Sequence, residues 1–205
     1  MNLANAMIRS SAKLQAVTIA AAHGQTTDKE QWNEVLRDGR NVLVRPIRHQ
    51  DTTLERRFIK RLSPRSRRLR FLSTMSSPSN ALLKLLVDID PAREVALIAL
   101  TSGGADEHEI GVARLSADAD GRACEFAITV SDEWQRNGLG SVLMQRLIDE
   151  AIARGLESMH AIGSASNDAM RGFASHLGFQ HQSDPNDATQ MLYTLDLGKK
   201  GAVST

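Results

Sequence analysis

The chain has 205 residues, of which 41% are hydrophobic and 24% charged, and its formal net charge is +1 at pH 7. Such a composition is typical of one globular domain, and so small a net charge gives no electrostatic case for a nucleic-acid partner. No apolar run is long enough to span a membrane, and a single cysteine excludes an internal disulfide. These features predict a cytoplasmic protein with no membrane partner.

The first forty residues are expected to form an N-terminal arm outside the main domain. Residues 1–25 are rich in alanine and show no clear capping signal. Thr27 and Glu30 have the spacing of a capping box, which predicts a short helix running on to Leu36. The domain itself is expected over residues 41–197, followed by a disordered tail over 198–205.

Periodicity and turn residues predict the elements of the domain in chain order. Strands are expected over Asn41–Ile47, Glu94–Ser102, Glu109–Ala117, Arg122–Val130, Ser158–Ser164 and Thr189–Leu197. Helices are expected over Thr52–Leu62, from Pro64 onward, and over Ala81–Ile89, Leu139–Arg154 and Asn167–Leu177. Short turns at Gly103-Gly104 and at Asp118–Gly121 would make the three middle strands an antiparallel meander.

The two helices before residue 72 are strongly basic, which admits two interpretations. They could present a surface to an acidic protein partner or to coenzyme phosphates, or they could simply form a solvated helical face. The basic residues are Arg56, Arg57, Lys60, Arg61, Arg65, Arg67, Arg68 and Arg70.

The stretch Ala123–Gly155 organises the domain, because it combines a strand, a glycine-containing turn and a long amphipathic helix. One face of the strand is bulky and apolar, as a core face should be, and the other is small and carries one carboxylate, Glu125. The turn Gln135–Gly140 places two glycines where the helix begins. Because the first N–H groups of a helix are unpaired and partly positive, this turn could cradle a pyrophosphate, with Arg136 as an added cation.

Other interpretations of the turn remain open on the residues alone. Asn137-Gly138 is a hairpin signal, but the residues that follow have a helical period. A dinucleotide fingerprint needs a third glycine where Leu143 stands, and a P-loop needs Gly-Lys-Ser/Thr, which is missing. A plain strand-to-helix turn is the remaining alternative.

The residues Gln135–Gly140 resemble the Q/R-x-x-G-x-G/A acetyl-CoA motif of the GNAT acetyltransferase superfamily. A second stretch, Asn167–Phe179, resembles the segment that closes the coenzyme site in that fold. Further stretches resemble the GNAT domain of bacterial protein-lysine acetyltransferases, which modify acyl-CoA synthetases. They are Val44–Ile47, Leu62–Pro64, Arg70-Phe71, Glu94–Leu97 and Gly111–Leu115.

This resemblance implies an α/β (α+β) fold with a mixed, mainly antiparallel sheet of six to seven strands flanked by helices. It also implies an N-acetyltransferase that moves an acetyl group from acetyl-CoA to an amine, preferably a protein lysine, by direct attack in a ternary complex. A small-molecule amine as acceptor and a non-catalytic coenzyme A-binding sensor are the alternatives. No metal is expected, because the histidines are scattered and no metal-ligand spacing occurs.

Site residues follow from the resemblance. Glu125 would be the general base that removes a proton from the amine, with Glu94 as the rival carboxylate. The Ile128 amide would serve the thioester carbonyl and Val130 the pantetheine arm, while Asn167 would hydrogen-bond the pantetheine or cap its own helix. The full coenzyme set is Ile128, Thr129, Val130, Gln135, Arg136, Asn137, Gly138, Leu139, Gly140, Ser141, Asn167, Met170 and Phe173.

Two side chains limit the chemistry. Many GNAT enzymes carry a tyrosine as general acid where this chain has Ala174, so the proton donor to the leaving thiolate is unassigned, with water as the default. Cys124 lies on the apolar strand face beside no base, which predicts a buried structural thiol instead of a nucleophile.

Overall fold

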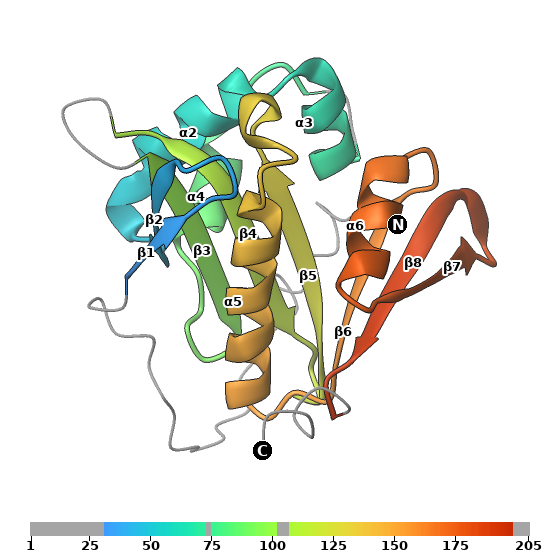
Figure 1. Ribbon diagram of the computed structural model, residues 1–205. Coiled ribbons are helices and arrows are strands. Elements are labelled where there is room, and N and C mark those ends of the chain that lie inside the picture. Colours follow the sequence, from blue (N-terminus) through green and yellow to red (C-terminus); the bar gives the residue numbers. More distant parts are fainter. Residues whose placement is uncertain (1–30, 73–74, 102–106, 199–205) are drawn as a thin grey trace.

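The computed structural model describes residues 31–72, 75–101 and 107–198. Within them, one sheet of eight strands has the order β1-β2-β3-β4-β5-β6-β8-β7 (Figure 1). All neighbouring strands are antiparallel except β5 and β6, which run parallel. The strands are β1 Trp32–Val35, β2 Asn41–Pro46, β3 Glu94–Thr101, β4 Glu109–Ala117, β5 Ala123–Val130, β6 Ser158–Ser164, β7 Gln180–Asp184 and β8 Asp187–Asp196.

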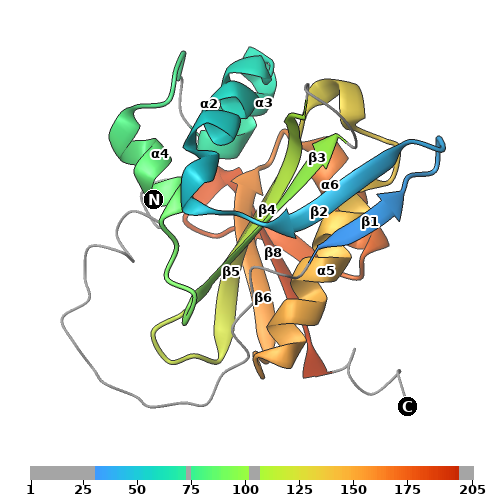
Figure 2. The same cartoon turned by 90° about the vertical axis from the view of Figure 1, so that its left-hand side faces the viewer.

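Helices cover both faces of the sheet. Helix α5 crosses one face over β3, β4 and β5, and α2 and α4 cover the other (Figure 2). Each side has its own apolar layer, one centred on Phe126 and Leu143 and the other on Phe58 and Ile98. The helical segments are η1 His49–Asp51, α2 Thr52–Arg61, α3 Pro64–Phe71, α4 Asn80–Val87, η2 Asp132–Trp134, α5 Leu139–Ala153 and α6 Asp168–His176.

The central meander and its alternation are confirmed. Cys124 and Phe126 are buried in the layer under α5, where the Phe126 ring packs on Phe179 with centroids 4.9 Å apart. Glu125 lies between them in sequence and therefore faces the opposite side of the sheet, where α3 contacts β5. The sheet thus presents Glu125 on a face that a helix only partly covers, because its side chain is half-buried.

Local signals set the helix ends as predicted, to within two residues. The hydroxyl of Ser63 accepts from the Ser66 amide, with Pro64 at the first helical position of α3. Gly155 follows α5 with φ of +74°, the left-handed conformation that ends a helix. Asp51 stands at the N-cap of α2, but its buried carboxylate binds Arg45 at 2.7 and 2.9 Å instead of capping that helix.

The helix predicted to run to Leu36 is wrong over its described part, because Trp32–Val35 is a strand paired with β2. The first strand of the sheet therefore lies within the segment assigned to the arm. Helix α5 holds it, since Arg146 lies 2.6 Å from the Glu34 carboxylate and 4.9 Å from the centre of the Trp32 ring. Tertiary contacts with α5 override the local helix signal here.

Strand β7 was also missed, so the sheet has eight strands where six to seven were expected. Its residues Gln180–Asp184 are polar and mostly exposed, so they carry none of the apolar alternation by which a strand is recognised. The predicted turn at Gly103-Gly104, the capping box Thr27–Glu30 and the tail beyond Gly198 lie outside the described residues.

Candidate active site

The parallel strands β5 and β6 pair over only three residues each and then separate (Figure 1). Their ladder joins Ala123–Glu125 to Ser158–His160, while β5 continues to Val130 and remains paired on its other edge with β4. The edge of β5 beyond Glu125 is therefore free of β6. An edge strand with free peptide groups is a ready partner for an extended ligand.

The peptide groups at this free edge can be assigned from the hydrogen bonds at the two ends of β5. The Ala123 carbonyl accepts from Asp118 at 2.8 Å and the Ser131 amide donates to Ile110 at 2.9 Å, so odd-numbered residues face β4. Because alternate residues of a strand face opposite edges, the peptide groups of Ile128 and Val130 face the free edge. Both are residues for which the sequence predicted main-chain roles.

The turn that follows has two residues in the left-handed backbone region. Gly138 has φ of +98° and Arg136, a non-glycine residue, has φ of +63°. In the first turn of α5 the Leu139 amide donates to the Asn137 side chain at 3.2 Å and the Val142 amide to the Gly138 carbonyl at 3.1 Å. The amides of Gly140 and Ser141 lie between these two and belong to the first-turn donors that have no partner inside a helix.

Two other parts of the chain lie against this turn. A Cβ atom added to Gly140 would come within 3.3 Å of the Phe173 ring, so α6 packs directly on the start of α5. A Cβ atom on Gly138 would meet Arg37 Cγ at 3.4 Å. Close approach to Phe173 therefore favours glycine at 140, whereas the positive φ favours glycine at 138.

Arg37 is a cation at the turn that the sequence analysis missed. It lies in the loop between β1 and β2, and its amide donates to the Asn137 carbonyl at 3.1 Å. Its side chain is exposed and runs over Gly138. No local pattern indicates it, because Arg37 and Gly138 are brought together by the packing of the β1–β2 hairpin.

The coenzyme residues predicted from the sequence include some with accessible side chains and some with buried side chains. Asn167 caps α6 by accepting from the Met170 amide at 3.2 Å, and Gln135 donates to the Val130 carbonyl at 3.1 Å. The side chains of Thr129, Asn137 and Leu139 are instead buried, so these residues could serve a ligand only through their main chains.

Glu125 is half-buried and has no hydrogen-bond or ion-pair partner among the described residues. Burial and, to a lesser extent, the Asp118 carboxylate raise the pKa of Glu125 to about 7, against the opposing Arg70 guanidinium. A carboxyl group with a pKa near neutrality can both accept and release a proton at physiological pH. Its surroundings thus suit a general base.

Helix α3, which covers Glu125, is tied to the segment just before the turn. The Asp132 carboxylate accepts from the amide and hydroxyl of Ser63 at 2.9 and 2.8 Å and from the Ser66 hydroxyl at 2.8 Å. These hydrogen bonds therefore join helix α3 to the segment that leads into the turn.

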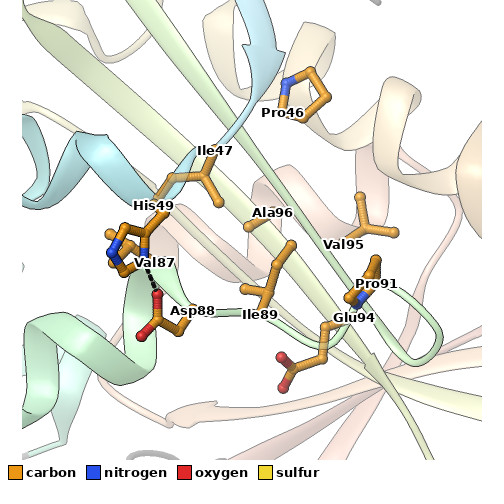
Figure 3. Close-up of a pocket in the computed structure, with 10 residues that line it drawn as sticks. All are labelled: Pro46, Ile47, His49, Val87, Asp88, Ile89, Pro91, Glu94, Val95 and Ala96. Carbon is orange, nitrogen blue, oxygen red and sulfur yellow. Dashed lines mark hydrogen bonds and ion pairs between the residues drawn. The ribbon is translucent and has the colours of Figure 1, made fainter. Parts of the chain in front are cut away.

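The rival carboxylate, Glu94, is engaged elsewhere. It accepts a hydrogen bond from the Asp90 amide at 2.9 Å, which closes the turn before β3. It also borders a cavity of about 400 Å³ over Ile47 and Ala96, opposite the paired His49 and Asp88 (Figure 3). Glu94 therefore has a structural role that Glu125 lacks.

Cys124 is fully buried, and burial raises the pKa of its thiol to about 12, as expected of a structural cysteine. Ala174 is buried, and Ser175 and His176 beside it are exposed. Among the described residues, no three His, Cys, Asp or Glu side chains lie together as metal ligands would. None of the helices described here is long and apolar enough to cross a membrane.

The chain is similar to known proteins in sequence and in fold. The sequence profile of the Acetyltransferase (GNAT) family matches residues 77–179. The chain is 44% identical over 168 residues to "Acetyltransferase PA5475" of Pseudomonas aeruginosa, an alignment that covers 82% of this chain and 90% of that protein.

Two further similarities concern proteins named Pat. "Acetyltransferase Pat" of Mycolicibacterium smegmatis is 30% identical over 142 residues, which are 69% of this chain but only 38% of that longer protein. The crystal structure of the GNAT domain of S. lividans PAT superposes with a TM-score of 0.74 at 25% identity, covering 81% of this chain and 96% of that domain.

Proposed function

The chain belongs to the GNAT acetyltransferase family, and from that membership we propose that it transfers the acetyl group of acetyl-CoA to an amine, preferably a protein lysine. The similarity to Pat of M. smegmatis and to the GNAT domain of S. lividans PAT supports this choice of acceptor. The cytoplasm is the compartment we propose, because acetyl-CoA is a cytosolic metabolite.

Several features of this chain fit acetyl-CoA. Coenzyme A carries a pyrophosphate, for which the first-turn amides of α5 and the cations Arg136 and Arg37 are suited. It also carries an amide-containing pantetheine arm, for which the free edge of β5 offers the Ile128 peptide group and the Val130 amide, while Gln135 binds the Val130 carbonyl. We therefore assign the pyrophosphate to the turn and the arm to the strand edge.

The thioester supplies an activated acyl group, and residues of this chain supply the base and the hydrogen-bond donor. Glu125 accepts a proton from the acceptor ammonium, because a free lysine amine has a pKa near 10.4 and is mostly protonated at neutral pH. The Ile128 amide donates to the oxygen on which negative charge develops. Since Cys124 is buried, no cysteine nucleophile is available, which supports direct attack by the amine in a ternary complex.

The observation that carries the proposal is the position of Glu125. It is a half-buried carboxylate without a partner among the described residues, at the place where β5 becomes free of β6. A coenzyme-binding module without catalysis would have no use for a base at this position.

An acetyl-CoA turnover assay over a panel of amines and lysine-bearing proteins, including an acyl-CoA synthetase, tests the proposal. Turnover with a protein lysine and weak turnover with free amines is the expected result. Preference for a free amine would favour the small-molecule enzyme. Tight coenzyme A binding without turnover on any acceptor would favour a sensor, an alternative that the buried Ala174 in the usual tyrosine position keeps open.

A further inference from the structure

His160 lies next to Glu125 across the β5–β6 ladder. The two residues are register partners on parallel strands, where neighbouring strands are about 4.8 Å apart. Register partners in a ladder share a face, and the preceding pair, Cys124 and Met159, points into the apolar layer under α5. Glu125 and His160 must therefore both face the opposite side of the sheet.

This pair is also the last one in the ladder. Beyond it no register pair joins β5 and β6, so Glu125 and His160 stand where the free edge of β5 begins. Both side chains are half-buried, so they are shielded from bulk water but accessible to a small ligand or to single water molecules. The His160 imidazole therefore lies beside the proposed general base, Glu125.

The His160 imidazole has no evident structural role among the described residues. Among the described residues, neither the His160 ring nor the Glu125 carboxylate has a hydrogen bond or an ion pair. Neither side chain is therefore committed to a structural partner among these residues, and both are available for proton transfer.

The neighbours on the same face leave the pair a route for protons to solvent. On β8 the register partner of His160 is Thr194, which is exposed and uncharged. The next residue on this face of β6 is the uncharged Ile162. The charged groups that act on Glu125 are Asp118 and Arg70.

We propose that His160 is a proton-relay residue that takes the proton from Glu125 after each deprotonation of the acceptor and passes it to solvent. The proposal rests on the proposed acetyl transfer. An ammonium N–H bond breaks as an O–H bond forms on Glu125. That O–H bond then breaks as its proton passes to a water molecule that bridges the two side chains, and the water gives one of its own protons to the imidazole as an N–H bond forms there. The imidazolium then releases the proton to bulk water. Glu125 returns to the carboxylate form, and no electrons change hands between groups.

Burial is the largest cause that raises the pKa of Glu125 to about 7, so this carboxyl group can give up its proton near neutral pH. The relay also supplies a path to solvent in addition to direct release from the half-buried carboxyl group.

The kinetic test compares His160→Gln and His160→Ala with the wild type on one acceptor. Both variants should lose about 10- to 100-fold in kcat at low buffer concentration, with an unchanged KM for acetyl-CoA. Added imidazole should restore much of the activity of His160→Ala, because a free base can replace the missing relay. Exposed His176, on α6, gives the matched control His176→Gln, which should behave as wild type.

Unchanged kcat in His160→Gln would overturn the proposal. So would a loss that imidazole does not restore, because that result indicates a packing role.

A second measurement separates failure of the relay from failure of the proposed function. The ring signals of His160, followed by NMR over pH in the coenzyme-free protein, should respond to Glu125 and change their titration curve in Glu125→Gln. Identical curves in the two proteins would overturn the relay even in an active enzyme. If the two groups are coupled but the protein acetylates no acceptor, the proton exchange between Glu125 and His160 stands. Only the proposed acetyl transfer is then refuted.

Discussion

Glu94 and Glu125 lie in one row across the sheet, because each is the register partner of Ser116 on the strand between them. They face the same side, two strand spacings or about 10 Å apart. Glu94 is held by the Asp90 amide, whereas Glu125 has no hydrogen-bond donor among the described residues. The sheet thus presents two similar carboxylates, of which one closes a turn and the other faces the free strand edge.

Glu125→Gln should lower kcat by ~100- to 10,000-fold, because it keeps the shape of the side chain and removes the base. Coenzyme affinity, measured by calorimetry, should barely change. Glu94→Gln is the matched control and should keep most of the activity on the same acceptor at saturating acetyl-CoA. If the Glu94 variant loses activity and the Glu125 variant keeps it, Glu94 is the base. If neither variant loses activity, the enzyme works by positioning alone.

The pH dependence of kcat should report the raised pKa of Glu125. A general base works as the carboxylate, so kcat should rise as pH increases through about 7 and level off above it. The same step should vanish in Glu125→Gln. An acceptor amine with a different pKa separates the two ionisations, because a step that moves with the acceptor belongs to the acceptor.

Gly138→Val should weaken coenzyme A binding at least ~10-fold, or ~1.4 kcal/mol. The added side chain meets Arg37 and imposes strain at a φ of +98°. Gly121→Val is the control for strain alone, because Gly121 has φ of +70° and nothing within 4 Å of an added Cβ atom. Calorimetry that finds equal affinity in a folded Gly138 variant would refute the pyrophosphate site.

Arg37→Gln should weaken coenzyme A binding about 3-fold or more, because the exposed guanidinium would lose its attraction for a phosphate. The loss should shrink in high salt, which screens exposed charges. Arg57→Gln removes an equally exposed arginine from α2 and should change affinity little. An equal effect of both substitutions would mean that only the overall charge matters and that Arg37 makes no local contact.

Glu109→Gln should stabilise the fold increasingly as pH rises. Glu109 is fully buried, and its oxygens have no hydrogen-bond partner within the described residues. Burial and the neighbouring Glu55 raise its pKa well above the usual range, although Arg114 opposes them. The folded state therefore keeps a proton that the unfolded chain releases above its pKa of about 4.3, so wild-type stability falls as pH rises toward the folded pKa.

Urea unfolding at several pH values from 5 to 8 measures this difference. The free energies of unfolding of wild type and Glu109→Gln should diverge with pH. Parallel curves would show that Glu109 is ionised in the native protein. His181→Gln, an exposed change on β7, controls for general effects of substitution.

Much of the fold could be predicted because its signals are local. Alternation along Ala123–Val130, the helical period after Gly138 and the cap at Ser63 each depend on residues a few positions apart. The meander followed from short turns, since close strands in sequence pair with each other. Two motifs in the right order then indicated the family, which the comparisons confirmed.

What the sequence determined by itself was therefore the identity of the central elements and the residues of the turn. Tertiary structure decided that Trp32–Val35 would be a strand, since Arg146, which holds it against α5, lies far along the chain. It also placed Arg37 over Gly138 and His160 beside Glu125. The register of a parallel pair is set by the packing of the crossover helix against the sheet, a long-range effect that no local pattern of residues records.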